Sequence, residues 1–275
     1  MDIKNIFDDD TEIINLCNKY YEKKEDIVSM FKIQENILNS KKRKIRINAT
    51  NCEYISPTCM IILSSVKLIS KENSKDIKIV ITKKSYFADM LKEYGFIEVN
   101  KTNKNNIPLN TIYKEEQIPN VILQLIELSP LKRLNNIKKA NLQSRLYEIP
   151  NNSLNHSNSL NGVLYSGYYK KDGFYFSIYD MGIGIPNSVK KFLNSPNMSS
   201  QEALKWALKE GNSTKQSDYP RGVGFTLLEE FRKNVKGKIL IITDNVYYES
   251  KNNYSNYTNL SKKVRGTLFT FKIEV

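Results

Sequence analysis

The pattern of apolar and polar positions changes along the first part of the chain. Residues 1–40 carry apolar side chains at helical spacing, and the stretch DDDTEIINL places acidic residues where a helix would begin. This pattern predicts an amphipathic helical lead-in. After the basic cluster KKRK, the stretches KIRINAT (44–50) and DIKIVIT (76–82) alternate between polar and apolar side chains, which predicts two strands.

Two helices are predicted to accompany these strands. SPTCMIILSSVKLISK (56–71) is apolar over most of its length and begins with Ser56 and Pro57, which are typical of a helix N-cap and first turn. SYFADMLKEYGF (85–96) has a helical stripe that stops at Gly95, and FIEV then predicts a short strand. Because strands and helices alternate, we expect a small α/β domain whose sheet is at least partly parallel.

A polar stretch without periodicity separates this region from the rest of the chain. KTNKNNIP (101–108) ends in proline and has no helical or strand pattern. A chain of 275 residues with 40% hydrophobic content is long enough for two cores. We therefore expect two domains, residues 1–105 and residues 106–275.

The stretch FYFSIYDMGIGIP (174–186) alternates as a strand and ends in an aspartate followed by glycines. Gly182 and Gly184 would let the backbone turn tightly and let a ligand approach the main chain. The carboxylate of Asp180 would then be a fixed hydrogen-bond acceptor. An ordinary turn after a strand has the same residues, so both interpretations stay open.

A second glycine pair lies in EGNSTKQSDYPRGVGFTLLEEFRKN (210–234), where a polar loop precedes an amphipathic helix. The helix is predicted to begin at Arg221-Gly222-Val223-Gly224. Its free N–H groups and the positive end of its dipole suit a phosphate chain, and Arg221 or Lys215 would add charge-assisted contacts. A helix start with a purely structural role would look the same.

The chain's only histidine lies in YEIPNNSLNHSNS (147–159). Glu148, Asn152 and His156 are four residues apart, so a helix would place them on one face. An asparagine oxygen suits Mg²⁺, which usually completes its shell with water and phosphate, and a glutamate one turn away can activate a nucleophile. A capped polar helix is the alternative. Pro150 is expected to start or kink the helix, which would displace Glu148.

Taken in order, these motifs resemble the GHKL family of ATP-binding domains, which includes gyrase, MutL, histidine kinases and anti-sigma-factor kinases. The resemblance covers roughly residues 110–275. It rests on Glu148-x3-Asn152-Ser-x2-His156, Asp180-x-Gly182-x-Gly184-Ile-Pro, Gly222-x-Gly224-Phe and, in the predicted last strand VRGTLFTFKIEV, Gly266-Thr267.

The resemblance implies ATP and Mg²⁺ as ligands. Asn152 would bind Mg²⁺, Glu148 would be the general base, and Asp180 would accept a hydrogen bond from the adenine amino group. The other implied nucleotide contacts are Gly182, Gly184, Ile185, Lys215, Arg221, Gly222, Val223, Gly224, Phe225 and Thr267. The implied fold is a Bergerat-type α/β sandwich, with a mixed sheet covered on one face by helices. The implied ATP lid lies between the Asp180 and Gly222 motifs, and SSQEALKWALKEG predicts a helix within it.

The first domain resembles the STAS fold of anti-sigma-factor antagonists, in which a strand leads into a turn and a helix that carries a regulatory serine. Where that family tends to have Asp-Ser-Ser-Gly, this chain has Ser56-Pro57-Thr58-Cys59. Thr58 as a phosphoacceptor is one interpretation of this turn. A plain helix N-cap in a docking or scaffold domain is the other.

Charge and composition limit the possible partners, metal sites and location of the protein. The net charge of +13 fits a nucleic-acid partner, although a chain generally rich in Lys, Asn and Ile reaches the same charge without a dedicated basic face. The cysteines and the single histidine lack zinc-site spacing. The apolar run Met60–Val66 is too short to span a membrane, and the acidic N-terminus does not resemble a signal peptide, so a cytoplasmic protein is expected.

Two classes of function follow. A self-contained histidine kinase needs a phosphoacceptor histidine on a preceding helical hairpin, and the only histidine here lies inside the nucleotide motif. We expect an ATP-binding regulatory protein with slow Mg-ATP hydrolysis, or with phosphotransfer to a partner as in anti-sigma-like serine/threonine kinases. The alternative is an ATP-gated, non-catalytic module that binds a partner protein, a second copy through the first domain, or nucleic acid.

Overall fold

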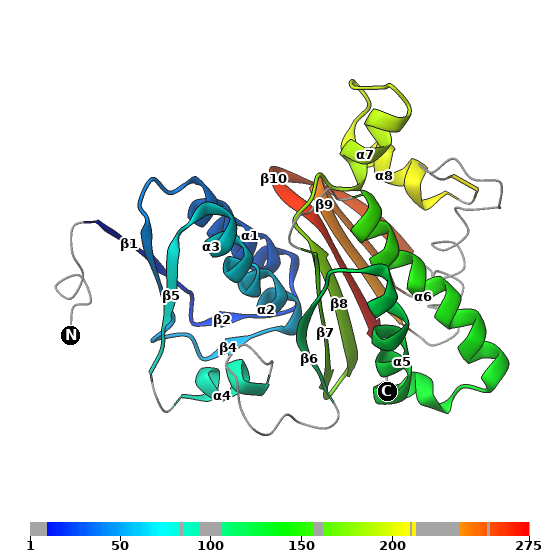
Figure 1. Ribbon diagram of the computed structural model, residues 1–275, viewed down its shortest axis with the longest axis horizontal. Coiled ribbons are helices and arrows are strands. Elements are labelled where there is room, and N and C mark those ends of the chain that lie inside the picture. Colours follow the sequence, from blue (N-terminus) through cyan, green and yellow to red (C-terminus); the bar gives the residue numbers. More distant parts are fainter. Residues whose placement is uncertain are drawn as a thin grey trace. The chain divides into compact units, whose positions relative to one another are not determined.

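A computed structural model describes residues 10–82, 85–93, 106–156, 162–209, 211–212, 237–251 and 254–274 (Figure 1). The chain divides into two compact units, residues 1–103 and 104–275, and the predicted boundary lies slightly further along the chain. Both units are mixed α/β with open sheets. Within the described part, no helix has the length and apolarity needed to cross a membrane.

The first unit is built on a sheet of three parallel strands in the order β1-β3-β5, with β2 and β4 paired separately and also parallel. Parallel strands need crossover connections, and helices supply them. Its elements are β1 (Thr11–Asn15), β2 (Lys19–Tyr20), α1 (Lys24–Asn39), β3 (Lys44–Asn48), β4 (Tyr54–Ile55), α2 (Pro57–Ser64), α3 (Val66–Asn73), β5 (Asp76–Val80) and α4 (Tyr86–Glu93).

The predicted strands at 44–50 and 76–82 are confirmed, and so is the helix start at Ser56. The Ser56 side chain accepts a hydrogen bond from the Cys59 N–H at 3.3 Å. The apolar helix does not continue unbroken to residue 71, because it divides at Ser65 into α2 and α3. The Ser65 hydroxyl donates to the Ile62 carbonyl oxygen at 2.6 Å, a side-chain bond that competes with the helix ladder and favours a bend.

The predicted helical lead-in is wrong over residues 11–20, where the chain forms β1 and β2. Thr11–Asn15 pairs in parallel with Lys44–Asn48, and its Thr and Ile side chains are β-branched residues that favour strands. Pairing with a strand distant in sequence therefore decides the conformation, and the first helix begins only at Lys24. The predicted stop at Gly95 and the predicted strand FIEV lie outside the described residues.

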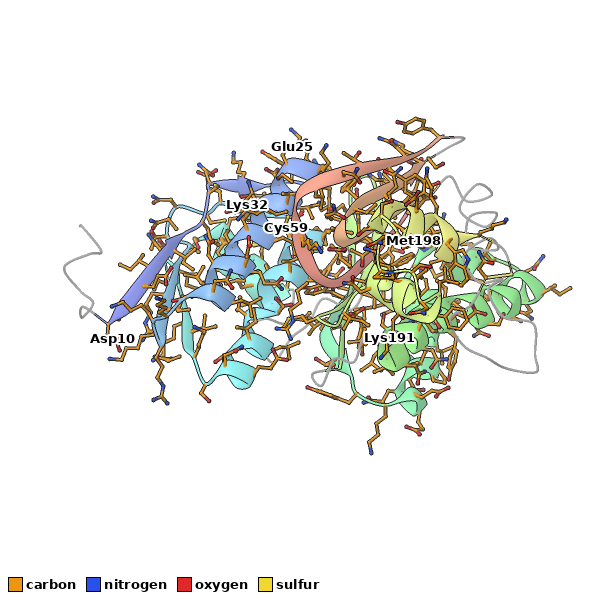
Figure 2. The ribbon with its side chains drawn as sticks, turned by 90° about the horizontal axis from the view of Figure 1, so that it is seen from above. Asp10, Glu25, Lys32, Cys59, Lys191 and Met198 are labelled. Carbon is orange, nitrogen blue, oxygen red and sulfur yellow. The ribbon has the colours of Figure 1, made fainter. Side chains whose placement is uncertain are left out.

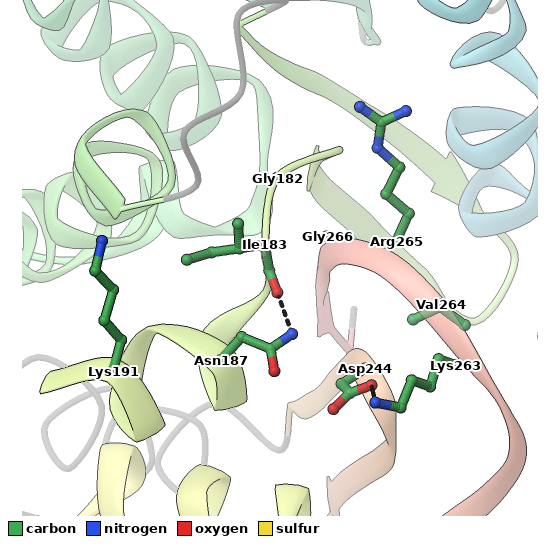
Figure 3. A pocket seen from close by; sticks show the side chains of 9 residues that line it. All are labelled: Gly182, Ile183, Asn187, Lys191, Asp244, Lys263, Val264, Arg265 and Gly266. Carbon is green, nitrogen blue, oxygen red and sulfur yellow. Dashed lines mark hydrogen bonds and ion pairs between the residues drawn. The ribbon is translucent and has the colours of Figure 1, made fainter. Parts of the chain in front are cut away.

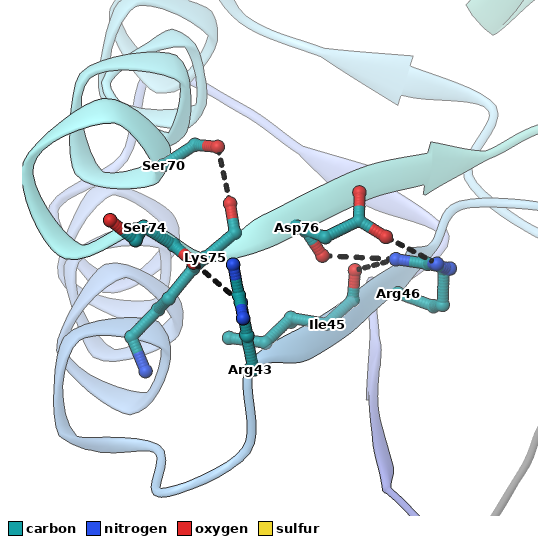
Figure 4. A network of polar contacts seen from close by, with 7 residues as sticks. All are labelled: Arg43, Ile45, Arg46, Ser70, Ser74, Lys75 and Asp76. Atoms are coloured by element: carbon teal, nitrogen blue, oxygen red, sulfur yellow. Dashed lines mark hydrogen bonds and ion pairs between the residues drawn. The ribbon is translucent and has the colours of Figure 1, made fainter.

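Arginine side chains hold the beginnings of β3 and β5 together (Figure 4). The Arg46 guanidinium donates to the Asp76 carboxylate at 2.8 Å and to the Asp76 carbonyl oxygen at 3.0 Å. Arg43, from the cluster KKRK, donates through Nε to the Ser74 carbonyl oxygen at 3.2 Å. The hydrogen bond from Arg46 lowers the pKa of the Asp76 carboxyl. At least part of this basic cluster therefore has a structural role.

The second unit is built on a five-stranded sheet in the order β6-β7-β8-β10-β9. Every described pair in it is antiparallel, so the expected mixed sheet is wrong for these strands. Strands β7 and β8, and β9 and β10, follow each other directly, whereas α5 and α6 lie between β6 and β7. Its elements are β6 (Ile107–Ile112), η2 (Glu115–Gln117), α5 (Ile118–Leu128), η3 (Pro130–Arg133), α6 (Asn136–His156), β7 (Val163–Lys170), β8 (Gly173–Asp180), α7 (Ile185–Phe192), α8 (Ser200–Leu208), β9 (Lys238–Lys251) and β10 (Tyr254–Ile273).

Helices α5 and α6 cover one face of this sheet (Figure 1). Their apolar stripes pack against alternate residues of the central strands, and the main members of this core are Val121, Leu125, Leu142, Leu146, Ile149, Phe176, Ile178, Phe269 and Phe271. Pro150 does not start a helix, since α6 begins at Asn136 and runs through Pro150 to His156. We attribute the tolerance of this proline to the packing of the surrounding stripe, which outweighs one lost backbone hydrogen bond.

Candidate functional site

The site is built around the buried carboxyl group of Asp180. This residue ends β8, and its register partners are Val163 on β7 and Thr267 on β10. Only 3% of Asp180 is exposed, and its Oδ1 accepts a hydrogen bond from the Gly182 N–H at 3.0 Å. The Ser153 hydroxyl and the Thr267 N–H also hydrogen-bond to this carboxylate.

Burial and hydrogen bonding act in opposite directions on Asp180. Removal from water penalises the charged form and raises the pKa, while the hydrogen bonds from Gly182, Ser153 and Thr267 favour the carboxylate and lower the pKa. Burial has the larger effect, and the resulting pKa is about 7. The group is therefore poised between its neutral and charged forms near neutral pH. Such perturbed groups cluster at functional sites.

Helix α6 supplies Ser153 because the residue lies on the helix face that packs on the sheet. Leu142, Leu146, Ile149 and Ser153 are separated by four, three and four residues, the spacing of one helical stripe. Ser153, which directly follows Asn152, is not among the residues predicted from the sequence. Continuing the apolar stripe by one turn identifies it as the polar residue that points toward the sheet.

Glu148 and Asn152 lie one helical turn apart in α6, as the spacing predicts. Glu148 is half-buried and Asn152 is exposed. Asn152 adjoins Ser153 in the chain, so its backbone lies close to the position where α6 contacts Asp180. His156 ends the helix, and its side chain lies outside the described part of the chain.

The glycine loop after Asp180 is tied to the last two strands. The Ile185 N–H donates to the Thr243 hydroxyl at 3.1 Å and to the Thr267 hydroxyl at 3.3 Å. Gly184 has φ +80°, and a Cβ atom there would lie 2.8 Å from Thr243 Oγ1. A side chain at Gly184 would therefore strain the backbone and disturb this bond. Thr243, on β9, is a second site residue that sequence reasoning missed.

Gly266 lets β10 approach Asp180 closely. Its φ is +77°, and a Cβ atom there would lie 1.9 Å from the Asp180 carbonyl oxygen. No side chain fits at that distance, so the glycine before Thr267 is a steric requirement. The motifs at 148–156, 180–184 and 266–267, which are far apart in sequence, therefore meet around one carboxylate.

The predicted phosphate-binding segment lies outside the described residues. This concerns Lys215, Arg221, Gly222, Val223, Gly224 and Phe225, whose assigned contacts stay predictions. Of the predicted lid, the helix at 199–211 is confirmed as α8, which begins with a capping box between Ser199 and Glu202.

No group of three or more His, Cys, Asp or Glu side chains gathers at a metal site among the described residues. Asn152 alone would be one oxygen ligand, exposed on α6. One protein oxygen fits a Mg²⁺ ion that takes most of its ligands from substrate phosphates and water. It does not fit a metal held by protein side chains alone.

Comparison with models of known protein families gives no match to this chain, and a search of curated proteins also gives none.

Proposed function

We propose that the second unit is a Mg-ATP-binding domain of the GHKL type, with a Bergerat-type sandwich whose described strands are all antiparallel. The supporting observation is the meeting of α6, the end of β8 and the Gly266-Thr267 step of β10 around the buried carboxyl group of Asp180. These are the motifs whose order resembles that family. A structural turn would need neither a buried carboxyl group nor three converging segments to form it.

Asp180 would recognise the adenine end of the nucleotide. A buried carboxylate oxygen is a strong acceptor for an amino group, and a base that leaves this acceptor unpaired would bind poorly. Gly182 and Gly184 keep side chains out of the loop, and Thr267 holds the loop through the Ile185 N–H. The chain's own residues would thus set both the shape and the polarity of the base pocket.

Asn152 and Glu148 would act at the phosphate end. The exposed Asn152 amide oxygen would hold Mg²⁺, which neutralises phosphate charge when bound. Glu148, one turn earlier, would accept a proton from the attacking water or hydroxyl group. Since α6 is continuous through Pro150, the proline does not remove Glu148 from this helix. Slow hydrolysis or phosphotransfer to a partner is the activity that we propose.

The first unit would bind a protein partner or a second copy of the chain in the cytoplasm. Its parallel sheet with an N-capped apolar helix is compatible with the STAS-like fold that we propose for it. Thr58 is fully buried and its N–H donates to Glu22 at 3.1 Å, which favours the helix-start role over a phosphoacceptor role. A nucleic-acid partner stays an alternative based on the net charge of +13.

Calorimetric titration with ATP tests the binding proposal. Asp180→Asn keeps the size of the side chain but presents an amide, and we expect at least several-fold weaker binding, a loss of about 1–3 kcal/mol. Asp172→Asn is the matched control, because Asp172 is a surface acid of the same unit that pairs with Lys272. Equal ATP affinity of wild type and Asp180→Asn would remove Asp180 from the site.

Rates of phosphate release and phosphotransfer then separate an enzyme from an ATP-gated module. If the protein is an enzyme, Glu148→Ala should bind ATP normally and lose most of the wild-type rate. Equal and negligible rates for both proteins would support the non-catalytic alternative.

A further inference from the structure

A hollow lies beside the glycine loop (Figure 3). It has a volume of about 500 Å³ and is formed by the loop at Gly182, helix α7 and strands β9 and β10. Ser153 and Thr267, which hold the Asp180 carboxylate, are not among its lining residues. The hollow therefore shares Gly182 with the proposed adenine pocket but does not include the groups that hold the Asp180 carboxylate from α6 and β10.

Three basic side chains line this hollow: Lys191 from α7, and Lys263 and Arg265 from β10. The acid that lines it is Asp244, which is 2% exposed. One Asp244 oxygen accepts from the Ser200 hydroxyl at 2.5 Å, and the other lies 3.6 Å from the Lys263 ammonium. Asp244 thus offsets one of the three positive charges, and an excess of positive charge still lines the hollow.

The backbone is shaped to bring these cations together. The pairing of β10 with β9 shifts register between Asn259 and Val264 and again between Val264 and Thr267, so the chain carrying Lys263 and Arg265 leaves the regular ladder. Irregularities of this kind re-aim side chains near binding sites. Asp244 itself has φ +49°, a strained conformation for an aspartate, and such strain is typical of functional sites.

Arg265 also ties the hollow to the glycine loop. Its Nε donates to the Met181 carbonyl oxygen at 2.9 Å, which fixes the guanidinium at the edge of the loop. Lys263 has a 75% exposed side chain and Lys191 is also exposed, so both can reach a ligand from solvent. The cations come from two elements and surround a concave space, a geometry that suits a compact, multiply charged anion rather than an extended surface.

We propose that this hollow is a binding site for a small phosphate-type oxyanion of the size of pyrophosphate. Lys191 and Lys263 supply charge, and the guanidinium of Arg265 supplies directed N–H donors for phosphate oxygens. The site shares Gly182 with the proposed nucleotide site but does not use the Asp180 carboxylate. The proposal does not depend on ATP binding.

Calorimetric titration of the full-length protein with inorganic pyrophosphate tests the proposal. We expect saturable binding that weakens about tenfold in Lys191→Ala and at least as much in Lys263→Ala, because each variant loses one charge-assisted contact. Lys132→Ala, at an exposed lysine of η3 in the same unit, is the matched control and should bind as wild type does. Thermal unfolding of each variant checks the fold. If Lys263→Ala is destabilised because Asp244 loses its ion-pair partner, the result for Lys191→Ala decides the test.

Asp180→Asn separates this site from the nucleotide site. If the proposal is right, Asp180→Asn binds pyrophosphate within a few-fold of the wild-type affinity, whatever its affinity for ATP, because the Asp180 carboxylate does not line the hollow and meets its lining through the Gly182 N–H. Absence of saturable pyrophosphate binding to the wild type would overturn the proposal. So would binding that is unchanged in the Lys191→Ala, Lys263→Ala double variant, since the anion would then occupy another part of the protein.

Discussion

The hydroxyl group of Ser153 hydrogen-bonds to the buried carboxylate of Asp180 and thereby joins helix α6 to the end of strand β8. This bond links the helix that carries Glu148 and Asn152 to the residue proposed to recognise adenine. A displacement of α6 would therefore change the hydrogen bonding of Asp180, and so its charge state. Both ends of the proposed nucleotide site depend on this contact.

Ser153→Ala removes one of the hydrogen bonds that favour the charged form of Asp180. We expect the pKa of the Asp180 carboxyl to rise further, because burial then acts against fewer compensating bonds. Carboxyl carbon NMR of wild type and variant across a pH titration measures this shift. Ser153→Thr keeps a hydroxyl group and should stay close to wild type. An unchanged Asp180 titration in Ser153→Ala would show that the contact is not made in solution.

Compared with the unfolded chain, the folded protein should favour the neutral form of Asp180. The pKa of Asp180 is raised from its ordinary value of 3.8 to about 7, so the stabilising preference for the neutral form is fully present below about pH 4 and is lost as the pH rises to about 7. Asp180→Asn has no such charge. The free energy of unfolding of Asp180→Asn, relative to that of the wild type, should therefore increase as the pH rises over this range, by a few kcal/mol at most.

Urea unfolding at several pH values measures this difference, and Asp172→Asn is the control. Burial raises the pKa of Asp172, but hydrogen bonds from Lys272 and Tyr175 outweigh burial and lower the pKa overall. The Asp172 carboxylate therefore stabilises the fold above its ordinary pKa, and that contribution is lost as the pH falls. If wild type and Asp180→Asn kept a constant difference from pH 4 to pH 8, the raised pKa of Asp180 would be wrong.

Gly266→Ala should disrupt the site, whereas Gly211→Ala should not. Both glycines have φ near +80°, so both substitutions carry a similar backbone strain of about 1–2 kcal/mol. Only at Gly266 does the added Cβ meet a backbone atom, the Asp180 carbonyl oxygen at 1.9 Å; at Gly211 nothing lies within 4 Å. Thermal unfolding and ATP titration of both variants separate strain from steric clash. Similar losses in the two variants would contradict this account of Gly266.

The sequence predicts much of this site because its motifs are local. The strand ending at Asp180 follows from alternation, and the shared face of Glu148 and Asn152 follows from helical spacing. Ser153 and Thr243 were missed for different reasons. Ser153 is visible as a continuation of the apolar stripe of α6, but Thr243 matters only because β9 lies beside β10 near the glycine loop, and such pairing between distant segments leaves no local signal.

The fold shows the same division between local and distant information. Ser56 begins α2 as predicted because capping depends on residues three positions apart. Thr11–Asn15 was predicted as helix because its short apolar run fits either period, and only pairing with β3 decides between them. Strand β9 and the first part of β10 were not predicted, and Tyr254–Asn259 is too polar to be recognised as a strand without its partner.

Strand β6 is one of the two edges of the described five-stranded sheet, and side-chain amides cover part of it. Thr111 N–H donates to the Asn110 side chain at 2.8 Å, and Tyr113 N–H donates to the Gln117 side chain at 2.7 Å. Uncovered edge N–H groups are templates for pairing with another chain. We therefore expect the Asn110→Ala, Gln117→Ala double variant to self-associate more strongly, as measured by sedimentation velocity. Gln124→Ala, on the neighbouring helix α5, is the control, and equal sedimentation of all three proteins would show that these amides do not protect the edge.

Deletion of residues 1–103 should leave nucleotide binding nearly intact. The residues around Asp180 all belong to the second unit, which also has a hydrophobic core of its own between Ile107 and Ile273. We expect the 104–275 fragment to bind ATP within a few-fold of the full-length affinity.

If the first unit binds a partner or a second copy, Mg-ATP can change that association only by binding one state more tightly than another. Light scattering of both proteins with and without Mg-ATP should then show a change of mass for the full-length chain alone. If the mass of the full-length protein never responds to Mg-ATP, with or without added partner protein or DNA, ATP does not gate association. Phosphotransfer to a separate substrate would then be the better account of the ATP site.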